Sequence, residues 1–365
     1  MMSDAFENAV IPPLTREEMI SLVEGRGAPR PAVACGHWLH IHELKEKDQD
    51  AVRAMLARYP EDMQVFYLHR PTFFIENGSR YTWCDVPGAD PRIGRTKRVG
   101  VDEETAISWE DYYKISADVP DVSEPSMYRF APEDDGRYRM VWFQNGPWQK
   151  ATDYRGMTNA LMDLYLEPEG MKHIARRVTD FFKAAIARGV RETRLDAIMF
   201  GDDLGMQKGA FMSNDMFREF LFPYYKEICD CAHSHGLHVW FHSCGDCFDL
   251  IPQLIEAGVD VLHPIQKYAL DERKVVDTYK DDLSFWAGMD LQQVLPFGTP
   301  EDVVAEVHHM IDTFYQPGKG KLILTLGNRL QDNVPVENFL TFLKEAHEYA
   351  VQVGQRQEET TDERD

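Results

Sequence analysis

The chain has 365 residues, and its 61 Asp and Glu residues against 39 Lys and Arg residues give it a formal net charge of −22. A surface this acidic repels nucleic acid and anionic membranes, so both are poor partners. No apolar stretch reaches the roughly 18 residues of a membrane helix, and the acidic start lacks the pattern of a signal peptide. Six scattered Cys residues indicate reduced thiols, so we expect a cytoplasmic protein.

Short apolar runs alternate with longer amphipathic segments along the chain. Because these runs are rich in Val, Ile, Phe and Trp, they are typical of buried strands. The eight runs are Ala32–Gly36, Gln64–Leu68, Arg139–Phe143, Ala197–Phe200, His238–His242, Asp260–Leu262, Leu283–Ala287 and Lys321–Leu326. Eight strands separated by helices predict an α/β fold, a (β/α)8 TIM barrel. An open doubly wound sheet is the alternative, although no glycine-rich phosphate loop follows the first run.

Helix signals lie between these runs. Asn214–His233 begins with an Asn-Asp pair that suits an N-cap and carries apolar residues at helical spacing. Phe248–Ala257 ends at Gly258, and Thr299 with Pro300 marks another capped start. We predict the last helix over Asn338–Val353.

The chain is longer than the roughly 250 residues that such a barrel needs. Most of the surplus lies in an N-terminal extension of about 30 residues and in Pro71–Gly136, which follows the second strand and has weak periodicity. We interpret 71–136 as an insertion over the barrel mouth, so residues 1–354 form one barrel domain. The polar segment 355–365 is predicted to be a disordered tail.

Polar residues follow the predicted strands, at the end where barrels carry their chemistry. Their convergence predicts one site, although strand-end polar residues can also serve only as helix caps; Asp246, Asp290 and Asn328 are the most open to that interpretation. The candidates are Trp38, Asp202, Asp203, His242, Cys244, Cys247, His263, Gln266, Asp290 and Asn328.

His242 and Cys244 are two residues apart, so both side chains point to the same side if strand geometry persists. Imidazole and thiolate together favour zinc, but a packed histidine beside an inert thiol is the other interpretation. A third ligand could come from Cys247 or from one of the pair Asp202 and Asp203. Because adjacent strand residues face opposite ways, we expect only one of that pair to face the site.

The stretch from Gly201 to Gln266, which contains HSCGDC, closely resembles the uroporphyrinogen decarboxylase superfamily and within it the corrinoid-dependent methyltransferase branch. The segments 152–168, 287–303 and 333–338 are also similar. The resemblance implies a uroporphyrinogen decarboxylase-like barrel with its site at the carboxyl ends of the strands. It also implies a zinc that a His-x-Cys pair and a later Cys hold. Asn328 stands at that later position, so the third ligand stays open.

The resemblance implies transfer of a methyl group from a small O- or N-methylated compound to the cobalt of a separate corrinoid protein. We find no cobalamin-binding signature in this chain, so a partner supplies the cobalamin. We predict a metal site with His242, Cys244 and Cys247, and catalytic roles for His242, Asp203 and His263. Substrate contacts are predicted for Trp38, Asp202, Gln266, Asp290 and Asn328.

Two other functions are open. A decarboxylase of the uroporphyrinogen type is one, but the first strand lacks the Arg-rich segment that pairs with substrate carboxylates in those enzymes. A degenerate barrel that only binds a ligand is the other. A homodimer is our expectation by analogy with the superfamily.

Overall fold

A computed structural model describes residues 10–68, 108–115 and 131–362. Most of the predicted insertion, 71–136, lies outside the described residues. The chain forms two compact units. Among the described residues, the first contains 10–66, 134–140 and 260–362, and the second contains 67–68, 108–115, 131–133 and 141–259.

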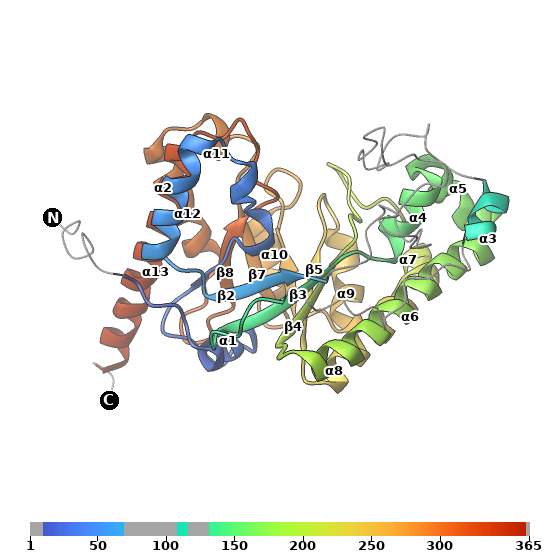
Figure 1. Ribbon diagram of the computed structural model, residues 1–365, viewed down its shortest axis with the longest axis horizontal. Coiled ribbons are helices and arrows are strands. Elements are labelled where there is room, and N and C mark those ends of the chain that lie inside the picture. Colours follow the sequence, from blue (N-terminus) through green and yellow to red (C-terminus); the bar gives the residue numbers. More distant parts are fainter. Residues whose placement is uncertain (1–9, 69–107, 116–130, 363–365) are drawn as a thin grey trace. The chain divides into compact units, whose positions relative to one another are not determined.

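The first unit is built on strands that run parallel in the order β1-β8-β7-β6. Figure 1 shows β7 and β8 of this unit side by side. Pairing of the first strand with the last, through Ala32 opposite Ile323, is the pairing that a closed (β/α)8 barrel requires. Its elements are α1 (Arg16–Val23), β1 (Ala32–Val33), α2 (Glu46–Arg58), β2 (Met63–Tyr67, whose last residue belongs to the second unit), β6 (Val261–His263), α10 (Glu272–Tyr279), β7 (Ser284–Met289), α11 (Val294–Phe297), α12 (Pro300–Phe314), β8 (Leu322–Leu326) and α13 (Val336–Asp362), with the short 3-10 helices η2 (Gly36–Trp38) and η3 (Ile41–Glu43).

The second unit carries the strand order β5-β4-β3. β4 and β5 pair in parallel over five residues, from Ala197 opposite His238 to Gly201 opposite His242. The two strands therefore end at the same level. The elements are α3 (Trp109–Ile115), β3 (Tyr138–Asn145, whose first three residues belong to the first unit), α4 (Pro147–Arg155), α5 (Met157–Leu166), α6 (Pro168–Glu192), β4 (Ala197–Gly201), α7 (Asn214–Phe220), α8 (Phe222–Ser234), β5 (His238–His242), η6 (Phe248–Leu250) and α9 (Ile251–Ala257).

All eight predicted strands are present, each shifted by at most a few residues, and the predicted (β/α)8 class is confirmed. β4 and β8 are buried at every residue. Continuous apolar runs of this kind are typical of parallel strands that are covered on both faces. None of the helices in the described ranges is long and apolar enough to cross a bilayer.

The predicted helix over Asn214–His233 is wrong in one respect, since it is two helices, α7 and α8, that meet at Leu221. Pro223 explains the break, because its ring nitrogen has no proton to donate and its ring clashes with the preceding turn. The N-cap is Ser213 rather than the Asn-Asp pair, and its hydroxyl accepts from the Met216 amide. The predicted helix end at Gly258, which caps α9, and the predicted helix start at Thr299, which caps α12, are both confirmed.

The last helix is longer than predicted. α13 continues to Asp362, so the polar segment from Gln355 is helical up to that residue. Glu, Gln and Arg are strong helix formers, which explains how a polar sequence continues the helix. The Tyr315 hydroxyl also donates to the Gln357 side chain at 2.5 Å and connects this end of α13 to the end of α12.

A buried ion pair holds the start of the first unit together. The fully buried Asp62 carboxylate accepts hydrogen bonds from both terminal nitrogens of Arg30 at 2.8 Å. It also accepts the amides of Leu14 at 2.7 Å and Val33 at 2.6 Å, and Val33 lies on β1. Burial by itself would raise the pKa of Asp62, but the Arg30 charge and these hydrogen bonds hold it below its ordinary value.

We predict that Asp62→Asn destabilises the folded chain by about 3–5 kcal/mol, because it leaves the Arg30 charge buried without a counter-ion. Urea unfolding at neutral pH measures this loss. Asp50→Asn is the matched control, since Asp50 pairs with Arg53 at the surface and should cost less than about 1 kcal/mol.

The difference between wild type and Asp62→Asn should depend on pH. Because the folded-state pKa of Asp62 is lowered, its contribution is fully present above the ordinary value near about 4. It is lost as the pH falls through the lower, folded-state value. A difference that grew on acidification would contradict this assignment.

Candidate functional site

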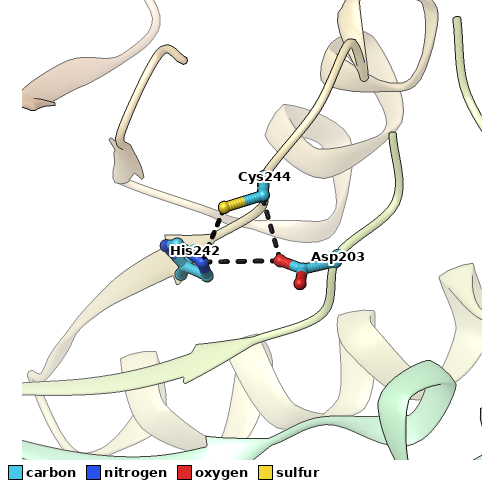
Figure 2. A group of neighbouring side chains, drawn as sticks. All are labelled: Asp203, His242 and Cys244. Carbon is cyan, nitrogen blue, oxygen red and sulfur yellow. Dashed lines mark hydrogen bonds and ion pairs between the residues drawn. The ribbon is translucent and has the colours of Figure 1, made fainter. Parts of the chain in front are cut away.

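The ends of β4 and β5 bring three potential metal ligands together. His242 is the last residue of β5, Cys244 follows two residues later, and Asp203 lies two residues beyond the end of β4. Figure 2 shows the three side chains converging from these two chain segments. Because Gly201 and His242 are paired in register, the segments that follow them leave the sheet side by side.

The distances within this triad are short. The His242 Nε2 atom lies 3.4 Å from Asp203 Oδ1 and 3.5 Å from Cys244 Sγ. One potential ligand atom from each residue lies within 4.8 Å of the others. The Cys244 amide also donates to Asp203 Oδ1 at 3.0 Å, so the backbone of one segment holds the carboxylate of the other. Asp203 and Cys244 are half-buried and His242 is buried.

The charges in the triad favour a cation. Burial lowers the pKa of His242, but the Cys244 sulfur and the Asp203 carboxylate outweigh it and raise that pKa to about 10. The Asp203 carboxylate and the Cys244 sulfur, which stabilise an imidazolium, would also stabilise a metal ion in its place. The triad therefore favours a positive charge at this position.

The triad fits zinc. Tetrahedral zinc with bonds of about 2.0–2.3 Å places neighbouring ligand atoms roughly 3.3–3.6 Å apart. The separations of 3.4 and 3.5 Å from His242 Nε2 agree with that spacing. Thiolate, imidazole and carboxylate are all ordinary zinc ligands, and three protein ligands are the number that catalytic zinc sites use.

Asp202 and Asp203 face different surroundings, as their adjacency suggested. Asp202 is fully buried, and its carboxylate accepts the amides of Trp148 and Gln149 at the start of α4 and the hydroxyl of Tyr225. Burial raises the pKa of Asp202 to about 7 against these three donors, which lower it. Asp202 therefore holds the start of α4 in place. Its side chain has no exposed surface, so we propose no substrate contact for it.

Cys247 does not join the triad. Its thiol is buried, and burial raises its pKa to about 12. Among the described residues, the group that can hold a metal consists of Asp203, His242 and Cys244. Asp203 replaces Cys247 as the third ligand that the geometry favours.

His263 and Trp38 pack together in the first unit. The His263 ring stacks on Trp38 with centroids 4.7 Å apart and lies 4.7 Å from Trp286. Its Nε2 atom lies 3.0 Å from the Leu326 carbonyl, which can only accept, so this nitrogen carries the proton. His263 is therefore a packed ring whose Nε2 donates to a backbone carbonyl. The predicted catalytic role of His263 and substrate role of Trp38 stay predictions.

The remaining predicted residues of the first unit differ in exposure. Asp290 is buried and caps α11, accepting the amides of Gln292, Gln293 and Val294 and the hydroxyl of Tyr268. Asn328 is exposed, and its side-chain oxygen accepts the amide of Arg329. The half-buried Gln266 closes a turn through its carbonyl, which accepts from Leu270. Asp290 thus has the capping role that was the alternative interpretation, and the substrate contacts of Gln266 and Asn328 stay predictions.

The family model of uroporphyrinogen decarboxylase (URO-D) matches residues 108–349, which is more than half of the chain. The chain belongs to the uroporphyrinogen decarboxylase family. The matched range contains all three residues of the triad. The membership confirms the resemblance that the sequence motifs indicated.

Relatives of this family member include methyltransferases. It is 23% identical over 239 residues to the methylated-thiol–coenzyme M methyltransferase of Methanosarcina mazei. That alignment covers 64% of this chain, and the chain spans 61% of the length of that relative. A solved structure of a methyltransferase from Methanosarcina mazei matches with a TM-score of 0.57 and 14% identity, over 92% of this chain and 99% of the other. At that identity the structural match shows the shared fold.

We predict that the purified chain binds about one zinc ion and that His242→Ala or Cys244→Ser abolishes this binding. Asp203→Asn should weaken binding more than the roughly 10–100-fold that loss of an outer-sphere partner costs. Metal analysis and chelator competition measure these changes. Cys247→Ser is the matched control and should retain zinc, whereas loss of zinc in that variant would restore Cys247 as the third ligand.

Proposed function

We propose that this family member transfers a methyl group from a small methylated compound to the cobalt of a separate corrinoid protein. The Asp203–His242–Cys244 triad is the observation that carries the proposal, because it can hold a Lewis acid at the ends of β4 and β5. The similarity to a methyltransferase supports the reaction class. O- and N-methylated donors are our first candidates, and the relative's name adds methylated thiols to those worth testing.

The reaction requires help at the leaving heteroatom. The bond between carbon and the heteroatom breaks, the electron pair of Co(I) forms the new bond to carbon, and the heteroatom keeps its bonding pair and takes up a proton. Co(I) is already a strong nucleophile, so the protein's task is to stabilise the charge that develops on the heteroatom. A zinc ion at the triad would supply that stabilisation when bound.

The chain's own residues have distinct parts in this proposal. His242 Nε2, Cys244 Sγ and Asp203 Oδ1 would hold the ion. The Cys244 amide fixes Asp203 Oδ1, so the carboxylate is oriented before any ligand binds. Two anionic ligands would balance the two positive charges of zinc, which leaves a site that accepts a heteroatom without excess charge.

Decarboxylation of a polycarboxylate is less well supported. Such a substrate needs cations, and Arg30, the arginine just before β1, is bound to Asp62 through both terminal nitrogens. The net charge of −22 also opposes a polyanionic substrate. We therefore keep methyl transfer as the proposed function.

The cellular setting is part of the proposal. The five cysteines within the described residues are free thiols, which agrees with a reducing cytoplasm. We propose that cobalamin arrives on the partner protein, and homodimerisation stays a prediction that light scattering can test.

We predict that the chain forms methylcobalamin when it is incubated with cob(I)alamin and a panel of methanol, methoxylated aromatics, methylamines and methylated thiols. Since a Lewis acid stabilises the transition state by several kcal/mol, His242→Ala and Cys244→Ser should lower the rate by at least about 100-fold. Cys247→Ser should retain activity. Absorbance of methylcobalamin follows the reaction.

Three outcomes would count against this proposal. Absence of methylcobalamin with every donor would favour a barrel that only binds a ligand. Release of carbon dioxide from uroporphyrinogen would favour the decarboxylase. Stoichiometric cobalamin retained by the purified chain alone would remove the need for a corrinoid partner.

A further inference from the structure

The segments that follow β4 and β5 are joined backbone to backbone beyond the ends of the strands. The Gly205 amide donates to the Cys244 carbonyl at 3.3 Å, and the Asp246 amide donates to the Met206 carbonyl at 2.7 Å. Met206 and Asp246 form an antiparallel bridge, although β4 and β5 themselves are parallel. These bonds connect the segment that carries Asp203 to the segment that carries Cys244.

Two glycines make this approach possible. A Cβ atom on Gly245 would lie 2.1 Å from the Gly205 carbonyl oxygen, and one on Gly205 would lie 2.4 Å from the Asp246 amide nitrogen. Both obstacles are backbone atoms, which cannot rotate away as a side chain can. Gly245 also has a φ of +81°, in the left-handed region that favours glycine. We call this contact the glycine clasp, Gly205 against Gly245.

Side chains close the same contact. The Ser243 hydroxyl accepts the Leu204 amide at 3.0 Å, and the Asp246 carboxylate accepts the Gly209 amide at 3.0 Å. Together with the bond from the Cys244 amide to Asp203, they connect the two segments on both sides of the clasp. The clasp is therefore surrounded by hydrogen bonds that fix its register.

The clasp lies where the sheet no longer controls geometry. Strand pairing ends at Gly201 opposite His242, so it places His242 but neither Asp203 nor Cys244. Contacts between the two loops hold those ligands. A methyl group at Gly245 would require a shift of at least 0.9 Å, the difference between 2.1 Å and the 3.0 Å below which real Cβ contacts essentially never occur. Metal sites tolerate only about 0.2 Å in their bond lengths.

We propose that Gly205 and Gly245 are positioning residues for the metal site, because their contact sets the separation between the Asp203 carboxylate and the Cys244 sulfur. This inference rests on the proposed zinc site. Neither glycine touches the ion or the substrate, and both act through the ligands on their own segments.

The test compares zinc affinity in Gly205→Ala and Gly245→Ala with that in two control variants. Gly236→Ala lies elsewhere in the second unit, and Gly318→Ala lies in the first unit. Both control positions have positive φ, and an added Cβ atom at either would meet nothing within 4 Å. The controls therefore carry the positive-φ strain of Gly245→Ala without its steric clash. Chelator competition gives the dissociation constants, and urea unfolding gives the stability of each metal-free variant.

We expect the clasp variants to bind zinc about 10–100-fold more weakly, as loss of an outer-sphere support does, and the controls to bind within about threefold of wild type. In cobalt-substituted protein, the thiolate-to-cobalt charge-transfer band should weaken in the clasp variants and persist in the controls. A merely structural glycine would not change this band while the protein stays folded.

The following results would contradict the inference. Wild-type zinc affinity in folded clasp variants overturns it and leaves the zinc site standing, whereas a wild-type chain that binds no zinc overturns both. Equal loss of affinity in Gly236→Ala would mean that strain alone is responsible. If the clasp variants do not fold, Ser243→Ala adds no clash and should weaken zinc binding several-fold, and unchanged affinity in that variant overturns the inference.

Discussion

The parallel register of β4 and β5 is the constraint on which the candidate site depends. Gly201 lies opposite His242, so the two strands end at the same level and the chain segments beyond them start side by side. A shift of one residue would turn each side chain of one strand to the other face of the sheet. His242 would then leave the position from which its ring reaches both Asp203 and Cys244.

The adjacent residues Asp202 and Asp203 have different roles in this arrangement. Asp202 turns into the protein and accepts the first amides of α4, where an added Cβ atom on Gly146 would lie 2.5 Å from its carboxylate. Asp203 turns toward His242 and stays half-buried. One carboxylate therefore fixes a helix and the other can bind a ligand, although they are neighbours in the chain. Backbone direction, not residue type, assigns their parts.

The strands could be predicted well because their signal is local. Buried parallel strands are continuous apolar runs, and such runs are visible in any single sequence. The break between α7 and α8 was also visible at Pro223, but the apolar spacing across it favoured one helix. The low hydrophobicity of the segment from Gln355 predicts disorder, whereas its helix-forming residues continue α13 to Asp362.

The (β/α)8 class, and His242 and Cys244 as potential ligands, could be predicted from the sequence, because strand patterns and a two-residue spacing depend only on neighbouring residues. The family could be predicted from the resemblance of its motifs. The third member of the triad was decided by the tertiary structure. Cys247 is close to Cys244 in sequence, but its buried thiol is not one of the three potential ligands that lie together. Asp203 is 41 residues from Cys244 and accepts its amide. Contacts between segments so far apart depend on strand register and on two glycines that let the loops meet. Only the folded chain contains that information.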